Sequence, residues 1–190
     1  MLSTYVKTLT RLGLLADAPA WAPVLRTKVL VRKSSVRYFV DPSIAAALLG
    51  RRPRELAESC RQNPPQDPTF ARFFANLCMR DLRIYSGTSG GTVRRYRDAS
   101  GLTCDAMVLH PDGRFGLVAM QLDGRVGVDL RVKRLKALDA TIAAGQTAHK
   151  PAFSMILTGT GAVSHQQHGQ HQQYLREDGI LVVPIGCLGP

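Results

Sequence analysis

Three histidines with a regular spacing are the residues in this chain whose pattern most directly suggests metal binding. His165, His168 and His171 recur every third residue, and imidazole nitrogens are good ligands for transition metals. The surrounding segment, SHQQHGQHQQ, contains a glycine and no apolar residue that could anchor it. The composition therefore favours a polar hairpin loop over a metal site, although the spacing permits either.

A short basic segment, Arg94-Arg95-Tyr96-Arg97, could bind a phosphate backbone, because cations alternate there with an aromatic ring. If the segment is a strand, Arg95 and Arg97 share one face and Arg94 shares the other with Tyr96. A half-exposed strand with solvated arginines explains the same pattern equally well.

The positive charge of the chain is concentrated in its first half. The 190 residues include 25 Lys and Arg against 14 Asp and Glu, a formal net charge of +11. Residues 1–100 carry a net charge of +10 and residues 101–190 only +1. Such a basic half attracts polyanions without sequence preference. We expect nucleic-acid contacts within residues 26–97, where Arg32 and Lys33 join the arginines at 94, 95 and 97; an Arg-rich solvated surface is the alternative.

Several classes of protein are excluded or disfavoured. The chain has no G-x-x-x-x-G-K-[ST] motif, and the glycine-rich turn 87–91 lacks the lysine of a phosphate-binding loop. No apolar segment is long enough to cross a bilayer and no signal peptide is recognisable, so we expect a cytoplasmic protein without membrane contact. No two cysteines form a C-x-x-C pair, which predicts reduced thiols at four positions: Cys60, Cys78, Cys104 and Cys187.

The first part of the chain predicts short elements around an irregular segment. Apolar spacing predicts a helix over 3–15, residues 16–35 read as irregular, and 36–40 as a strand. Asp41-Pro42 is a typical helix start, so we expect a short helix over 44–49, closed by Gly50, and another over 54–60.

From residue 67 onward the pattern is that of an α/β domain. A helix is predicted from Pro68 to about residue 85, and Pro111-Asp112-Gly113 predicts a hairpin turn. Strands are expected over 93–97, 103–109, 115–121, 153–158 and 180–185, with a second long helix over 129–144. This order predicts a mixed central sheet flanked by helices.

The order helix, three strands, helix, strand resembles the core of the restriction-endonuclease-like, PD-(D/E)XK nuclease superfamily. More narrowly, the chain resembles the uncharacterised C-terminal domain attached to many prokaryotic AAA-type ATPases. The resemblance is carried by short blocks spread over nearly the whole chain: TRLGLL at 10–15, YFVDPSIAAALLG at 38–50, YRD at 96–98, DAMV at 105–108 and VPIGCLGP at 183–190.

The resemblance implies a division into two parts. Residues 1–66 would be an N-terminal segment with a winged-helix remnant, whose last helix corresponds to 3–15, and residues 67–190 a nuclease-like core. A P-loop ATPase domain, upstream or separate, is then an implied partner.

The resemblance also implies where a catalytic metal would sit. Nucleases of this superfamily hold it with an acidic residue on one strand, a Glu on the next, and a Glu from the first helix, while a Lys two positions after the strand Glu orients the water. Asp105 matches the first carboxylate. The chain has Gln121 in place of the strand Glu, Asp123 in place of the Lys, and Ala75 in place of the helix Glu.

These departures weaken a divalent-metal site. A neutral amide is a poorer ligand for Mg²⁺ than a carboxylate, alanine offers no ligand, and an aspartate reverses the charge where a cation should act. We therefore predict a non-catalytic domain without metal or other cofactor, which contacts nucleic acid or another protein. The alternative is a divergent metal-dependent nuclease that uses Asp105 and Asp123.

Overall fold

The computed structural model describes residues 2–21, 31–32, 34–52, 54–55, 58, 68–122, 125–144, 150–159 and 173–189. Its helices are α1 (Leu2–Arg11), α2 (Pro42–Leu48), α4 (Pro68–Thr88) and α5 (Arg125–Ala144), and a short 3-10 helix spans Ile185–Cys187. Its strands are β1 (Leu15–Ala18), β2 (Val36–Phe39), β3 (Thr92–Arg97), β4 (Thr103–Leu109), β5 (Phe115–Gln121), β6 (Phe153–Thr158), β7 (Tyr174–Leu175) and β8 (Leu181–Pro184).

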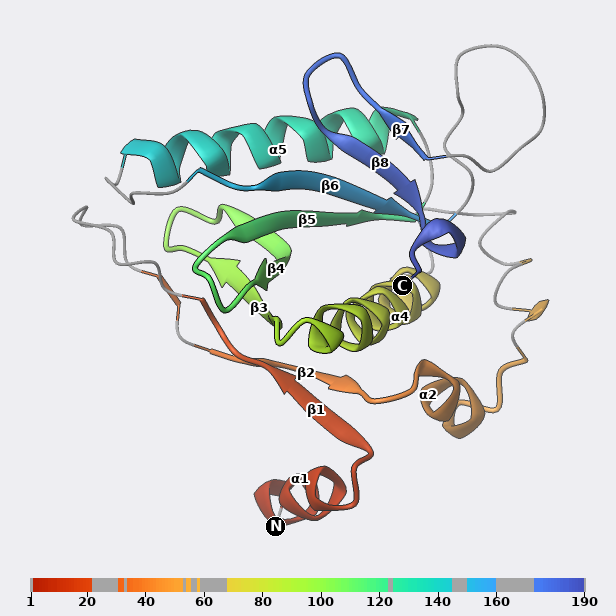
Figure 1. Cartoon of the computed structure of the whole chain (residues 1–190). Helices are drawn as coiled ribbons and strands as arrows, with labels where there is room; N and C mark the ends of the chain where they lie inside the picture. The colour runs from red at the N-terminus through yellow and green to blue at the C-terminus, as the bar shows by residue number, and fades with distance from the viewer. Residues whose placement is uncertain are drawn as a thin grey trace.

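Six strands form one mixed sheet in the order β3-β4-β5-β6-β8-β7 (Figure 1). The pairs β3–β4, β4–β5 and β7–β8 are antiparallel, whereas β5–β6 and β6–β8 are parallel. The parallel step from β5 to β6 requires a crossover, which α5 supplies. The predicted α/β class, with a mixed central sheet flanked by helices, is confirmed.

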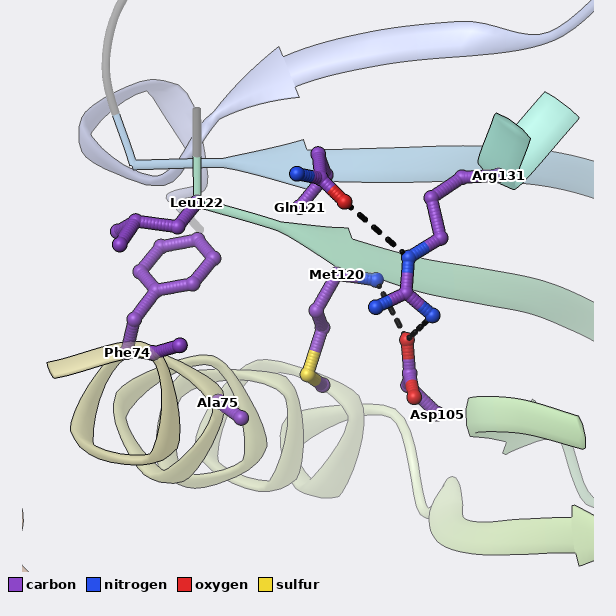
Figure 2. Close-up of a pocket in the computed structure, with 8 residues that line it drawn as sticks. Phe74, Ala75, Asp105, Met120, Gln121, Leu122 and Arg131 are labelled. Carbon is purple, nitrogen blue, oxygen red and sulfur yellow. Dashed lines mark hydrogen bonds and ion pairs between the residues drawn. The ribbon is translucent and has the colours of Figure 1, made fainter. Parts of the chain in front are cut away.

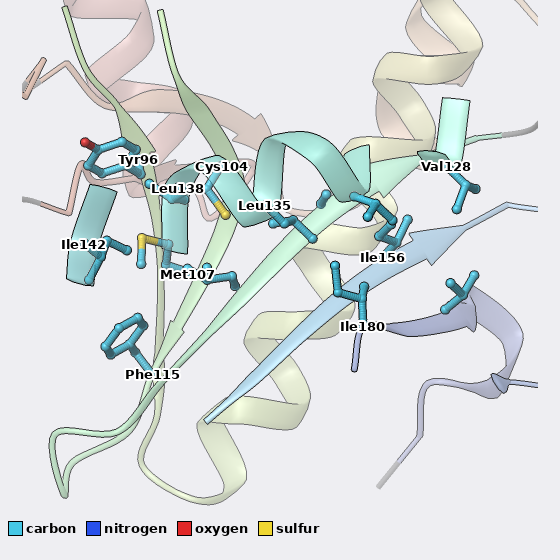
Figure 3. Close-up of a cluster of buried hydrophobic side chains, with 14 residues drawn as sticks. Tyr96, Cys104, Met107, Phe115, Val128, Leu135, Leu138, Ile142, Ile156 and Ile180 are labelled. Atoms are coloured by element: carbon cyan, nitrogen blue, oxygen red, sulfur yellow. The ribbon is translucent and has the colours of Figure 1, made fainter. Parts of the chain in front are cut away.

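The helix α5 covers one face of this sheet (Figure 3). Leu135, Leu138 and Ile142 are buried there, at helical spacing, against the side chains of β4, β5 and β6. The helix begins at Arg125, four residues before the predicted start, and Leu130 is half exposed rather than part of the stripe. Val128 and Val132 take the inward positions of the first turns instead.

The helix α4 covers the opposite face. Phe74, Cys78, Met79 and Leu82 are buried between this helix and the sheet. Residues at i, i+4, i+5 and i+8 lie on one side of an α-helix, so the predicted apolar stripe of this segment accounts for the contact. The sheet thus has two separate apolar layers, one for each helix.

A second, two-stranded sheet corrects the prediction for residues 16–35. Leu15–Ala18 is a strand, β1, which pairs antiparallel with β2 from Leu15↔Phe39 to Ala18↔Val36. The helix α1 ends at Arg11 rather than residue 15, because Gly13 adopts a left-handed conformation with φ of 72° and turns the chain. The predicted helix over 54–60 lies largely outside the described residues.

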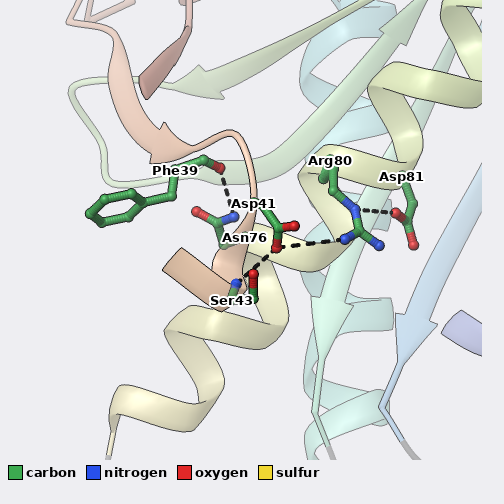
Figure 4. Close-up of polar contacts among 6 residues, drawn as sticks. All are labelled: Phe39, Asp41, Ser43, Asn76, Arg80 and Asp81. Atoms are coloured by element: carbon green, nitrogen blue, oxygen red, sulfur yellow. Dashed lines mark hydrogen bonds and ion pairs between the residues drawn. The ribbon is translucent and has the colours of Figure 1, made fainter. Parts of the chain in front are cut away.

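The N-terminal segment contacts the larger sheet at two places. Beside the edge strand β3, Ala20 pairs with Arg95, and Trp21 packs on Tyr96 and Phe115. On the helix side, the amide of Asn76 in α4 donates to the carbonyl oxygen of Phe39 at 2.8 Å (Figure 4). The boundary predicted at residue 66 stays a prediction; these contacts show that residues on its two sides touch.

The Asp41-Pro42 helix start forms as predicted. The Asp41 carboxylate accepts a hydrogen bond of 2.8 Å from the backbone N–H of Ser43 and so caps α2. Arg80 of α4 lies 3.8 Å from the same carboxylate and 2.8 Å from Asp81 (Figure 4). Within the described part of the chain, no helix is both long and apolar enough to cross a membrane.

Candidate functional site

A pocket opens where the strands β4 and β5 separate. Their antiparallel pairing runs from Leu109↔Phe115 to Ala106↔Val118 and goes no further. Beyond it lies a pocket of about 250 Å³, at the carboxyl end of β5, the edge at which α/β sheets commonly bind ligands. Its lining comes from both covering helices and both strands (Figure 2): Ala71, Phe74, Ala75, Asp105, Met120, Gln121, Leu122 and Arg131.

A bulge in β4 places Asp105 at this pocket. Arg94 pairs with Met107 and Tyr96 with Cys104, so one residue of β3 faces two of β4. The Asp105 carboxylate accepts a hydrogen bond of 2.9 Å from the backbone N–H of Met120. Asp105 therefore supplies an acceptor across the gap between β4 and β5, beyond their last backbone pair.

The guanidinium of Arg131, from α5, lies against this carboxylate. Its Nη1 is 3.2 Å from Asp105 Oδ2, and its Nε donates to Gln121 Oε1 at 3.3 Å (Figure 2). The side chains of Arg131 and Asp105 are 26% and 22% exposed, so the pair is largely shielded from water. Asp105 is the one carboxylate among the described lining residues, and it is therefore already paired with the positive charge of Arg131.

Arg131 was missed by the sequence analysis, although the pattern of α5 contains a signal for it. Val128, Arg131, Val132 and Leu135 occupy positions i, i+3, i+4 and i+7 of the helix, which lie on one face. An arginine within an otherwise buried stripe needs a shielded partner, because an unpaired buried charge is expensive. That signal predicts an acidic partner on the sheet but does not say which one.

The amide of Gln121 is packed tightly against the first turns of α5. A Cβ atom placed on Gly127 would overlap this amide, so the close approach depends on the glycine. Gln121 therefore lies between the backbone of α5 and the Arg131 guanidinium.

Three of the four positions named from the nuclease resemblance line the same pocket. Asp105, Gln121 and Ala75 come together from β4, β5 and α4, whereas Asp123 lies outside the described residues. Ala75 offers no ligand and Gln121 offers an amide oxygen that Arg131 already uses. Among the described residues, no group of three or more His, Cys, Asp or Glu side chains gathers anywhere that could hold a metal ion.

The other predicted site residues that the structure describes lie on or beside β3, away from the pocket. Arg95 and Arg94 are half-buried on opposite faces of β3, Arg97 is exposed, and the backbone N–H of Arg32 donates to the Arg97 carbonyl at 2.8 Å. Tyr96 is fully buried and its hydroxyl donates to Asp98 at 3.2 Å, so its ring is not available to stack on a base. Four predicted residues fall outside the described part: Lys33, His165, His168 and His171.

The described cysteines differ in environment. Cys78 and Cys104 are buried free thiols, and burial raises the pKa of Cys104 to about 12, whereas Cys187 is exposed. Cys60 lies outside the described residues. A thiol with so high a pKa is not a nucleophile near neutral pH, so Cys104 is a packing residue.

Comparison of the chain with protein-family models, with curated proteins and with solved structures gave no match.

Proposed function

We propose that this chain is a non-catalytic, nuclease-like α/β domain that contacts nucleic acid. One observation carries the non-catalytic part: the Arg131 guanidinium lies on the Asp105 carboxylate, where the resemblance implies a divalent metal. A single carboxylate already paired with a cation has little remaining attraction for Mg²⁺, which prefers several anionic oxygens around it.

Support for the nuclease-like part comes from the order of the elements. The succession α4, β3, β4, β5, α5, β6 is the helix, three strands, helix, strand of the resemblance. The helix α1 followed by the antiparallel pair β1 and β2 is also compatible with the implied winged-helix remnant. A P-loop ATPase domain, upstream or separate, therefore remains a proposed partner.

Support for nucleic-acid contact comes from charge. The net charge of +11 and its concentration in residues 1–100 favour a polyanionic partner. Fold analogy alone would not establish such a function, so binding and cleavage need separate tests.

The first experiment measures cleavage of plasmid DNA with Mg²⁺ or Mn²⁺ by the wild-type chain and by Asp105→Ala. We expect no metal-dependent cleavage from either protein. Metal-dependent cleavage by the wild type that Asp105→Ala abolishes would overturn the proposal and support the divergent nuclease that uses Asp105 and Asp123.

The second experiment restores the missing carboxylates. The triple variant Ala75→Glu, Gln121→Glu, Arg131→Ala removes the cation and places two further carboxylates on the pocket that contains Asp105. We expect Mn²⁺ binding by calorimetry in this variant and not in the wild type, and addition of Asp105→Ala should abolish it. Mn²⁺ binding by the wild type as tight as by the triple variant would contradict the role given to Arg131.

A further inference from the structure

The half-buried arginines of this structure fall into two groups. In the first, each guanidinium has an acidic partner, as Arg131 has Asp105 and Arg80 has Asp81. In the second, Arg83, Arg94 and Arg95 have no ion-pair partner among the described residues. Each of them also has one buried nitrogen without a hydrogen-bond partner there: Arg83 Nη2, Arg94 Nε and Arg95 Nε. Arg176 Nε is buried without a hydrogen-bond partner as well, but the guanidinium of Arg176 is ion-paired with Asp129 at 3.1 Å.

Buried donors without acceptors are rare in folded proteins and call for an explanation such as a bound ion. A half-buried guanidinium has lost part of its hydration, and only an acceptor can replace that loss. Burial accordingly lowers the pKa of Arg83. The second group is therefore better suited to an external anion than to solvent alone.

Two members of this group, Arg83 and Arg95, lie on the α4 side of the main sheet, the side against which Tyr38 packs. Arg83 of α4 lies over the Tyr38 ring of β2, with its Cζ 5.9 Å from the ring centroid. Arg95 shares the α4-facing side of β3 with Val93, because side chains alternate along a strand, whereas Arg94 lies on the other side. Burial raises the pKa of Tyr38, and the positive charges of Arg95 and Arg83 oppose that rise.

The carboxylates near this group are already used. Asp105 also acts on Tyr38 but pairs with Arg131, and Asp17 acts on Arg83 but pairs with Arg37 at 2.9 Å. Arg83 and Arg95 therefore have no ion pair of their own among the described residues, although the Asp17 carboxylate acts on Arg83 from a longer distance.

We propose that Arg83 and Arg95, together with the hydroxyl of Tyr38, form a binding site for a phosphate group of a nucleic-acid backbone. A phosphate offers several acceptor oxygens and negative charge, which guanidinium groups recognise with charge-assisted hydrogen bonds. The phosphate chemistry rests on the unpaired arginines, whereas the nucleic-acid source of the phosphate rests on the proposed function.

The test is the salt dependence of binding to a random-sequence DNA duplex, measured by filter binding between about 50 and 200 mM NaCl, the range over which phosphate contacts show their effect. Loss of one phosphate contact makes the negative slope of log K against log salt less steep by about 0.9. We expect that reduction for Arg83→Gln and for Arg95→Gln, and about twice as much for the double variant.

Two controls accompany these variants. Arg134→Gln removes the same charge from an exposed position of α5, on the opposite face of the sheet, and should leave the slope unchanged. Arg83→Lys and Arg95→Lys keep the positive charge and should retain most of the slope, which separates loss of a contact from damage to the fold.

The outcomes separate this inference from the proposed function. DNA binding by the wild type with an unchanged slope in the double glutamine variant overturns the phosphate site and leaves nucleic-acid contact intact. If the wild type does not bind DNA, nucleic-acid contact is refuted, and inorganic phosphate becomes the probe. Phosphate that raises the Tm of the wild type, but not of the double variant, at matched ionic strength then supports the site; no rise in the wild type overturns it.

Discussion

The pocket at Asp105 and the arginines near Tyr38 differ in how their charges are paired. In the pocket, the Asp105 carboxylate and the Arg131 guanidinium lie 3.2 Å apart and neutralise each other. The amide oxygen of Gln121 accepts a further hydrogen bond from Arg131. At Tyr38, two half-buried guanidinium groups have no carboxylate of their own among the described residues. The charge of the pocket is thus balanced internally, whereas Arg83 and Arg95 have no ion pair among the described residues.

The largest loss of stability should come from removing the Asp105 carboxylate from the pocket. Asp105→Ala removes the acceptor of the Met120 N–H and leaves the Arg131 guanidinium without its counter-charge, which should lower the free energy of unfolding by about 2–3 kcal/mol in urea denaturation. Asp139→Ala on α5, a half-buried aspartate with no ion pair among the described residues, is the matched control and should change much less. Equal losses in the two variants would argue against a special role for Asp105.

A smaller effect should appear in a double-mutant cycle on the same pair. Asp105→Asn, Arg131→Gln and the combined variant should give a coupling energy of about 1 kcal/mol, because the two side chains are only partly exposed. The combined variant should be more stable than the sum of the single losses predicts, since removing both partners leaves no unpaired charge. A coupling energy near zero in urea denaturation would show that the ion pair is incidental.

At the Tyr38 site, in contrast, we expect the removal of a charged side chain to change the stability little. Arg83→Gln should change the free energy of unfolding by less than about 1 kcal/mol, because loss of the contact with the Tyr38 ring is offset by removal of a poorly hydrated cation. Denaturant unfolding without DNA or phosphate measures this change. A loss as large as that of Asp105→Ala would erase the contrast between the two sites.

The smallest effect is expected at Gly127. Alanine there improves helix propensity by about 1 kcal/mol but displaces the Gln121 amide and weakens its hydrogen bond to Arg131, so the net change should be within about 0.5 kcal/mol. Thermal unfolding checks the net change. A marked stabilisation would mean that Gln121 contributes little to holding Arg131.

Local patterns predicted most of the main sheet and its helices. The stripe of α4, the Pro111-Asp112-Gly113 turn and the later strands depend on residues close in sequence, and each formed near its predicted place. The strands β1 and β7 were not predicted because they are short and form by pairing with β2 and β8. A strand of two to four residues has little periodicity of its own, so whether it forms depends on the strand with which it pairs.

The candidate site was predicted in part. Asp105, Gln121 and Ala75 were named from the resemblance, and the structure brings them to one pocket. Arg131 and Arg83 could not be assigned, because their importance depends on which carboxylates lie nearby, and that depends on how α4 and α5 cross the sheet. Tyr96 was named as part of a basic strand, but the pairing of β3 with β4 buries it.

The position of Trp21 provides an optical signal for the attachment of the N-terminal segment. It is the only tryptophan in the chain, and its ring centroid lies 5.4 Å from that of Phe115 and 6.4 Å from that of Tyr96. Its emission should therefore shift to longer wavelength as soon as the segment before β2 leaves the edge of β3. If that shift precedes the loss of circular dichroism during denaturation, the segment detaches as a separate unit; coincident transitions mean that both parts unfold together.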